Sequence, residues 1–93
     1  MVGTGGLSIY MKKLLIDVIE KAQQLSLPIK DIENSREFLK YNEYELCLDT
    51  IATQLYEYGI KIDREFYNSI IAIFRKMNID SENYNYLTEL LEI

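Results

Sequence analysis

The chain has 93 residues, of which 48% are hydrophobic and 27% charged, a composition that argues against wholesale disorder and fits one globular domain. Its formal net charge is -5 and it contains no histidine, which disfavours binding to nucleic-acid phosphates or anionic membranes and favours basic protein partners. The single cysteine, Cys47, cannot form an internal disulfide, so we expect a reducing compartment, the cytoplasm.

The first ten residues differ from the rest of the chain. Three of the four glycines lie within the first six positions, and the stretch that begins at Met11 resembles a natural start. We therefore predict that residues 1–10 are a flexible N-terminal extension or expression remnant, and that residues 11–93 form a single helical domain. The apolar run after Met11 is interrupted by Asp17 and Glu20, too early for a signal peptide or a membrane span.

Beyond this extension, apolar residues recur at steps of three and four, the period of an amphipathic helix. The segments with this period span residues 11–25 or 26, 29–41, 43–58 and 63–77, followed by a short segment after residue 81. With connections this short, the pattern predicts an all-α fold, a compact antiparallel bundle of about five short helices. The third helix would bury one face, formed by Tyr44, Cys47, Leu48, Ile51, Leu55 and Tyr58.

Particular residues mark the ends of these helices. Pro28 breaks the chain before the second helix, because the residue before a proline avoids the helical region. Asn42 and Gly59 tolerate the left-handed conformation in which many helices end. Asp63 and Ser81 are expected to cap the fourth and fifth helices, since their side-chain oxygens can accept hydrogen bonds from free backbone N–H groups.

Sequence motifs for catalysis, metals or nucleotides are missing from the chain. Without histidine and with one cysteine, the usual transition-metal ligands are absent, and no carboxylates have calcium-loop spacing. The glycines of residues 3–6 lack the lysine and the preceding strand of a phosphate loop. Cys47 lies between two leucines with no general base nearby, so we interpret it as a buried apolar residue. We predict no catalytic, cofactor-binding or metal-binding residues, and no enzymatic activity.

Acidic residues concentrate in the second and third helices. Between residues 31 and 57 there are seven acids and two bases, a local net charge of -5 that equals that of the whole chain. The acids are Asp31, Glu33, Glu37, Glu43, Glu45, Asp49 and Glu57. Two interpretations stay open here: a solvated surface that only aids solubility, or a surface that binds a basic partner.

The helical period predicts which side chains of the third helix point outward. If its core face is the one given above, then Glu45, Asp49, Thr53 and Tyr56 form an outward strip, with Leu46 on the same side. Tyr41 and Tyr56 are the two tyrosines that we expect outside the core. Aromatic and apolar anchors framed by carboxylates are typical of a protein interface.

One segment within residues 36–67 resembles the MafI family of bacterial immunity proteins, which belong with contact-dependent growth inhibition systems. The family pattern is matched by Phe38-Leu39, by Asn42-Glu43-Tyr44, by the helix start Leu46-Cys47-Leu48-Asp49 and by Tyr56-Glu57. Cys47 departs from the usual small alanine-like residue, and Asp49 replaces the usual glutamate. The match covers about a third of the chain strongly and the continuation to Met77 more loosely.

This resemblance implies a specific role. Such a protein stays in the cytoplasm, binds the C-terminal toxin domain of a large secreted or surface-displayed protein in a one-to-one complex, and blocks it. For this family the resemblance implies a ribonuclease toxin of the EndoU-like class. From the charge and the missing motifs we expect no membrane, nucleic-acid or small-molecule ligand and no cofactor. The expected toxin-binding residues are Tyr41, Glu43, Glu45, Asp49, Tyr56 and Glu57.

A second hypothesis is that the protein is an acidic helical adaptor or regulator that binds another basic protein. The neighbouring gene would distinguish the two hypotheses, because a toxin gene immediately upstream supports immunity. The sequence leaves open whether the toxin's active site or an exosite is bound, and it leaves the oligomeric state open.

Overall fold

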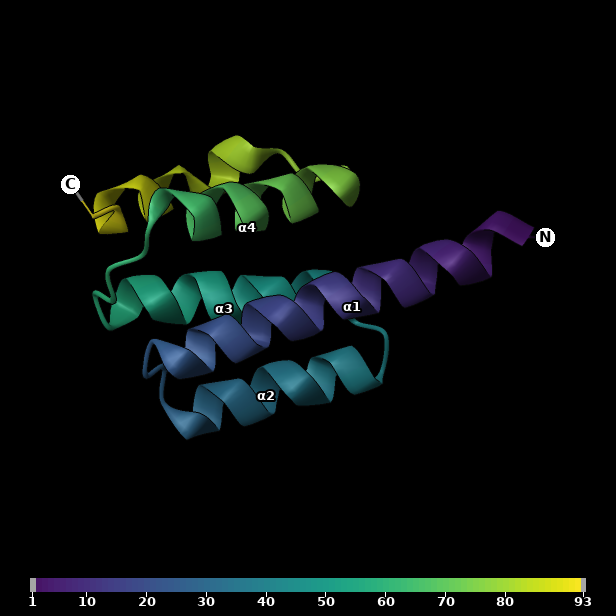
Figure 1. The fold of residues 1–93 in the computed structure, drawn as a ribbon, viewed down its shortest axis with the longest axis horizontal. Helices are drawn as coiled ribbons and strands as arrows, with labels where there is room; N and C mark the ends of the chain where they lie inside the picture. The colour runs from purple at the N-terminus through teal and green to yellow at the C-terminus, as the bar shows by residue number, and fades with distance from the viewer. Residues whose placement is uncertain (1, 93) are drawn as a thin grey trace.

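The computed structural model describes the backbone of residues 2–92 and the side chains of residues 9–92, and five helices make up most of this part of the chain. They are α1 (Val2–Gln24), α2 (Ile29–Lys40), α3 (Tyr44–Glu57), α4 (Arg64–Lys76) and the 3₁₀ helix η1 (Ser81–Leu90). Each helix runs opposite to the one before it, with α1, α2 and α3 on one side and α4 and η1 on the other (Figure 1). The predicted all-α bundle is confirmed.

Three of the predicted helices, α2, α3 and α4, have ends within one residue of the predicted positions, whereas the start of α1 differs. We expected that helix to begin at Met11, but α1 continues back to Val2, and its first turns project beyond the neighbouring helices (Figure 1). Met1 lies outside the described residues. The domain boundary after residue 10 stays a prediction.

All four α-helices end in the same backbone arrangement. The second residue after each helix adopts a left-handed φ, between 60° and 74°. The residue that follows it donates its N–H to the carbonyl five positions earlier. This is the Schellman arrangement, which satisfies carbonyls that a helix end leaves free. Asn42 and Gly59 were predicted in this role, whereas Ser26 and Asn78 were not.

The N-terminal caps confirm one prediction and correct another. Asp63 accepts a 2.7 Å hydrogen bond from the Phe66 N–H, so it caps α4 as predicted. We expected Ser81 to cap the last helix, but the cap is Asp80, which accepts a 3.0 Å bond from the Glu82 N–H. Ser81 is instead the first helical residue, and its hydroxyl accepts a 3.4 Å bond from the Arg75 guanidinium.

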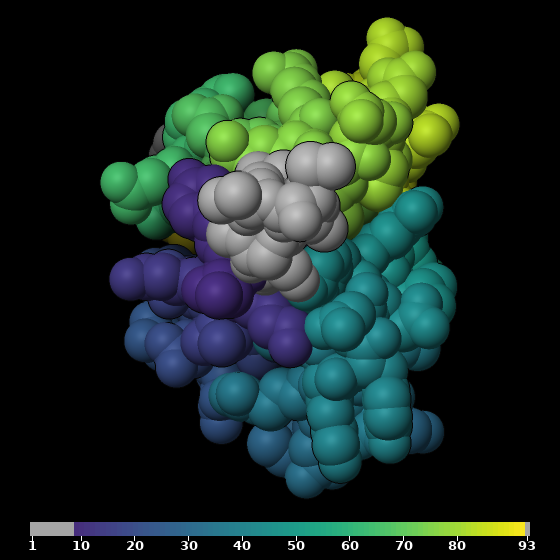
Figure 2. Space-filling view, turned by 90° about the vertical axis from the view of Figure 1, so that its right-hand side faces the viewer, coloured from purple at the N-terminus to yellow at the C-terminus, as the bar shows by residue number. Residues whose placement is uncertain are grey.

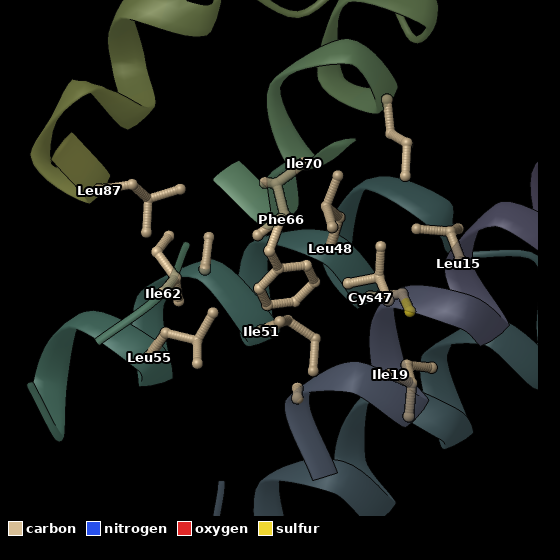
Figure 3. Packing of buried hydrophobic residues seen from close by; sticks show 14 of the residues in the cluster. Leu15, Ile19, Cys47, Leu48, Ile51, Leu55, Ile62, Phe66, Ile70 and Leu87 are labelled. Carbon is tan, nitrogen blue, oxygen red and sulfur yellow. The ribbon is translucent and has the colours of Figure 1, made fainter. Parts of the chain in front are cut away.

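The hydrophobic core surrounds α3, which contacts all four other helices. Figure 3 shows Leu15 and Ile19 of α1 and Ile70 of α4 directed toward the α3 residues. The predicted core face of α3 is confirmed for Cys47, Leu48, Ile51 and Leu55, all of which are fully buried. Tyr58 was wrongly included in that face, since it is 56% exposed. It is the C-cap residue, directly after the last residue of α3.

The C-terminal segment folds back over α3 and α4. Ile62, in the link before α4, donates its N–H to the Leu90 carbonyl and accepts from the Glu92 N–H, both at 2.9 Å. This isolated bridge is the only β-type pairing in residues 2–92. It fixes the end of η1, and a break from helical geometry at Tyr84 directs that side chain inward. As a result, η1 lies beside α3 and makes a shared surface with it.

Candidate functional site

The charges of this protein are divided unevenly between its elements. All ten lysines and arginines lie in α1, α2, α4 or at Lys61, so α3 and η1 contain none. Together α3 and η1 hold five carboxylates, those of Glu45, Asp49, Glu57, Glu82 and Glu89. By contrast, α2 balances three acids with three bases. From the sequence we predicted that the excess negative charge lies in the second and third helices, whereas in the fold it is concentrated on α3 and η1.

A row of aromatic rings joins α4, η1 and α3. The Tyr84 ring stacks on Phe74 of α4, with ring centroids 3.7 Å apart and an interplanar angle of 14°. Tyr86 lies 5.9 Å from Tyr84 and meets Tyr56 of α3 edge-on at 4.9 Å. The edge-on contact between Tyr86 and Tyr56 is a favoured geometry of aromatic pairs. The row therefore holds η1 against both of its neighbours.

The hydroxyl groups of these tyrosines link η1 to α3. Tyr84 donates a 2.7 Å hydrogen bond to Asp49, Tyr86 is hydrogen-bonded to Thr53, and Tyr56 donates a 3.3 Å bond to Glu89. These three pairs lie in sequence along the line where η1 meets α3. We define the acidic seam as Glu45, Asp49, Glu57 and Glu89 together with Tyr56, Tyr84 and Tyr86.

The negative charge of the seam acts on its own tyrosines. The nearby Glu89 carboxylate, and to a smaller extent Glu57, raises the pKa of Tyr56. Burial and the hydrogen bond to Asp49 raise the pKa of Tyr84 well above its ordinary value, with Glu45 contributing in the same direction. A negative potential opposes the loss of a proton from a phenol for the same reason that it attracts a cation. The carboxylates of the seam are thus close enough to its tyrosines to influence their titration.

Of the residues predicted to point outward from α3, some are exposed and others are covered by η1. Glu45, Leu46 and Tyr56 are exposed as predicted, with Tyr56 39% accessible. Asp49 and Thr53 were wrongly placed in the strip, because both are half-buried under η1 and bonded to its tyrosines. The Asp49 carboxylate therefore accepts a hydrogen bond within the protein, and its negative charge lies beneath the exposed surface.

The other predicted site residues lie at the two ends of α3. Tyr41 is 62% exposed, and it lies with the exposed Glu43 in the link before α3. Glu57 is exposed at the opposite end, beside Tyr56. A helix of 14 residues is roughly 21 Å long, so the six residues do not form one compact cluster. Glu45, Asp49, Tyr56 and Glu57 belong to the seam, whereas Tyr41 and Glu43 lie beyond its end.

Sequence reasoning missed the contribution of η1. Glu89, Tyr84 and Tyr86 complete the seam, but none of them was among the predicted site residues. One signal was available: no lysine or arginine follows Lys76, although four acids do. In Figure 2 the yellow-green atoms of this segment lie above the teal atoms of α3 along the right-hand edge.

The geometry gives no support for covalent chemistry at this site. Cys47 is fully buried, and burial raises the pKa of its thiol to about 12, which keeps it protonated at neutral pH. No group of three metal-ligating side chains gathers within the described residues. Carboxylates and tyrosine rings can hold a guanidinium or ammonium group by hydrogen bonds and by contact with the aromatic face. The arrangement is suited to binding a basic surface.

The chain matches no protein-family model, and comparisons with curated proteins and with solved structures find no significant match. Among residues 2–92, no helix is both long and apolar enough to cross a membrane.

Proposed function

We propose that this protein is an immunity protein that binds a cognate bacterial toxin domain and neutralises it. The observation that carries the proposal is the acidic seam, in which two neighbouring helices present carboxylates and tyrosines without a lysine or arginine of their own. The resemblance of residues 36–67 to the MafI family supports the same role. A basic toxin surface is the complementary partner for this side of the molecule.

The proposed mechanism is occlusion of an RNA-binding cleft. A ribonuclease of the EndoU-like class binds its substrate through cationic side chains that contact phosphates. Carboxylates of the seam would take the positions of those phosphates and keep RNA out. Complementary charge also accelerates encounter, so the toxin would be captured soon after synthesis in the producing cell's cytoplasm.

The residues of the proposed interface have different roles. Glu45 and Glu57 are exposed carboxylates that would contact cations of the toxin, and Tyr56 is an exposed aromatic side chain bonded to Glu89. Asp49 would act by positioning, because its bond to Tyr84 holds η1 in place. Tyr41 and Glu43 would extend the interface past the start of α3 if the toxin surface is long enough to reach them.

Co-expression with the protein encoded immediately upstream tests this function. Immunity predicts that growth is rescued from the toxicity of that protein and that the two co-purify as a one-to-one complex. If neither rescue nor binding occurs, the proposal fails. Binding to a basic protein that is not toxic would instead favour the alternative, an acidic helical adaptor or regulator.

A further inference from the structure

The last helix differs in its backbone from the other four. η1 is a 3₁₀ helix of ten residues, and Tyr84 within it departs from helical geometry, with a φ of -119° and a ψ of 20°. Runs of 3₁₀ helix longer than three or four residues are uncommon, because their hydrogen bonds have poorer geometry than those of an α-helix. The backbone of η1 therefore adds little to its own stability, and contacts with neighbouring elements hold it in place.

Those contacts involve only part of the bundle. Within the described residues, η1 packs against α3 and α4 but not against α1 or α2. It contributes Tyr84, Leu87 and Leu90 to the core, and Figure 3 shows Leu87 directed toward Ile62 in the link before α4. The four α-helices supply most of the other core residues, and α3 packs against each of the other three. Detachment of η1 would therefore leave most of this packing intact.

Like charges meet where η1 contacts α3. The side-chain bonds between these helices join partners that occur in the same order in both, so η1 runs parallel to α3. Neither helix contains a lysine or arginine, and each carries carboxylates. Glu57 belongs to α3 and Glu89 to η1, and both are close enough to Tyr56 to raise its pKa. Repulsion between like charges weakens the contact that the tyrosine hydroxyls form.

We propose that η1 is a strap, which detaches from α3 and α4 and returns while the four α-helices stay folded. Segments with few buried contacts and weak backbone hydrogen bonds open locally in this way. The open state would separate the Ile62 N–H from its acceptor, the Leu90 carbonyl at 2.9 Å. Because η1 is acidic, bases from other elements favour the closed state: Arg75 of α4 donates a 3.4 Å bond to Ser81, and Lys61 precedes Ile62 in the link.

Opening of the strap would dismantle the acidic seam, because Tyr84, Tyr86 and Glu89 all belong to η1. A basic partner that contacts both helices can bind only the closed state, so it would hold the strap closed. This consequence rests on the proposed function. The opening itself does not, and it is tested on the protein alone.

Hydrogen exchange of backbone amides, followed by NMR under native conditions, measures the opening. The Ile62 N–H reports on the strap, because its acceptor belongs to η1, whereas the Ile51 N–H in the buried part of α3 reports on the bundle. Relative to the rates of an unfolded chain, Ile62 should exchange at least about tenfold faster than Ile51. Equal protection of the two amides would overturn the proposal.

Two variants distinguish opening of the strap from unfolding of the bundle. Ile19→Val removes a buried methyl group from α1, which η1 does not contact within the described residues. Ile51 should then exchange about twofold to tenfold faster, while Ile62 keeps its rate. Tyr84→Phe removes a bond of the strap itself, so Ile62 should exchange about fivefold faster. The proposal fails if Ile19→Val accelerates Ile62, which would then exchange by global unfolding. It also fails if Tyr84→Phe leaves Ile62 unchanged, because only the end of η1 would then fray.

Neutralisation of one carboxylate tests the contribution of repulsion. Glu57→Gln removes the charge that α3 places near Glu89, so the protection of Ile62 should rise by about twofold. Glu37→Gln removes an exposed carboxylate from the last turn of α2, and this matched control should leave Ile62 unchanged. Unchanged or lower protection of Ile62 in Glu57→Gln would contradict the role of like charge in the opening.

Discussion

The hydroxyl of Tyr84 donates a 2.7 Å hydrogen bond to Asp49, 35 residues earlier in the chain. This contact joins the C-terminal segment to the middle of α3, and the same tyrosine ring stacks on Phe74 of α4. One side chain thereby connects three elements. Together with the bridge at Ile62, it places Glu89 relative to Glu45 and Glu57 in the acidic seam.

Removal of that hydroxyl should lower the stability of the fold. Tyr84→Phe keeps the ring stack but leaves the half-buried Asp49 carboxylate without its donor. We expect the free energy of unfolding in urea to fall by about 1–2 kcal/mol. Tyr41→Phe is the matched control, because this tyrosine is 62% exposed, and it should change stability by less than about 0.5 kcal/mol. Equal stability of the two variants would show that the bond is not stabilising.

Alkaline pH should destabilise the protein through the same tyrosine. The pKa of Tyr84 is raised in the folded state by burial and by Asp49, so above about pH 10 the folded state binds more protons than the unfolded state. The stabilisation is complete below the ordinary tyrosine pKa and is lost as pH rises toward the folded value. Urea unfolding across this range should show a steeper decline for the wild type than for Tyr84→Phe. Parallel declines would argue against a raised pKa at this position.

Gly59 permits the turn between α3 and the link to α4. Its φ is 60°, and an added Cβ would meet no atom within 4 Å, so Gly59→Ala changes only the backbone preference. A left-handed conformation costs a non-glycine residue roughly 1–2 kcal/mol, which is the loss of stability that we expect in thermal or urea unfolding. Asn78→Gly, at a left-handed position of the same type, should not destabilise the protein by as much. A neutral Gly59→Ala would contradict this explanation.

Cys47 should be unreactive in the folded protein. Its side chain is fully buried, and its pKa is raised to about 12, so neither access nor thiolate is available at neutral pH. Modification by a thiol reagent should be slow in buffer and accelerate with urea in step with unfolding. In a Cys47→Ala background, Leu46→Cys places a thiol at a position that is 46% exposed and should react at once. Rapid modification of native Cys47 would contradict the packing of α3.

The periodicity of the sequence was sufficient to predict α3 itself. Its ends and its buried residues from Cys47 to Leu55 follow from the geometry of a single helix, and Asn42 and Gly59 mark its limits through backbone preference. The exposure that we predicted for Asp49 was wrong for a different reason. Periodicity shows which way a side chain points, but not which other element covers it.

The C-terminal segment was the main source of error. Its 3₁₀ geometry and the inward turn at Tyr84 depend on contacts with Phe74 and Asp49, residues distant in the sequence. Local patterns do not contain such contacts. Ser26 was missed at the end of α1 because serine seldom adopts the left-handed conformation, and the residue that follows it, Leu27, is buried in the core. The net negative charge of η1, by contrast, could have been predicted from the sequence.

Toxin binding by charge-reversed variants tests the central proposal most directly. We would measure the affinity of the upstream-encoded toxin domain for Glu45→Lys, Glu57→Lys and Glu89→Lys combined in one chain. The control combines Glu20→Lys, Glu33→Lys and Glu37→Lys, which change the net charge equally at exposed positions on α1 and α2. We predict that the seam variant loses at least about tenfold more affinity than the control. Equal losses would mean that net charge alone attracts the toxin, and unchanged affinity in both would mean that the toxin binds elsewhere.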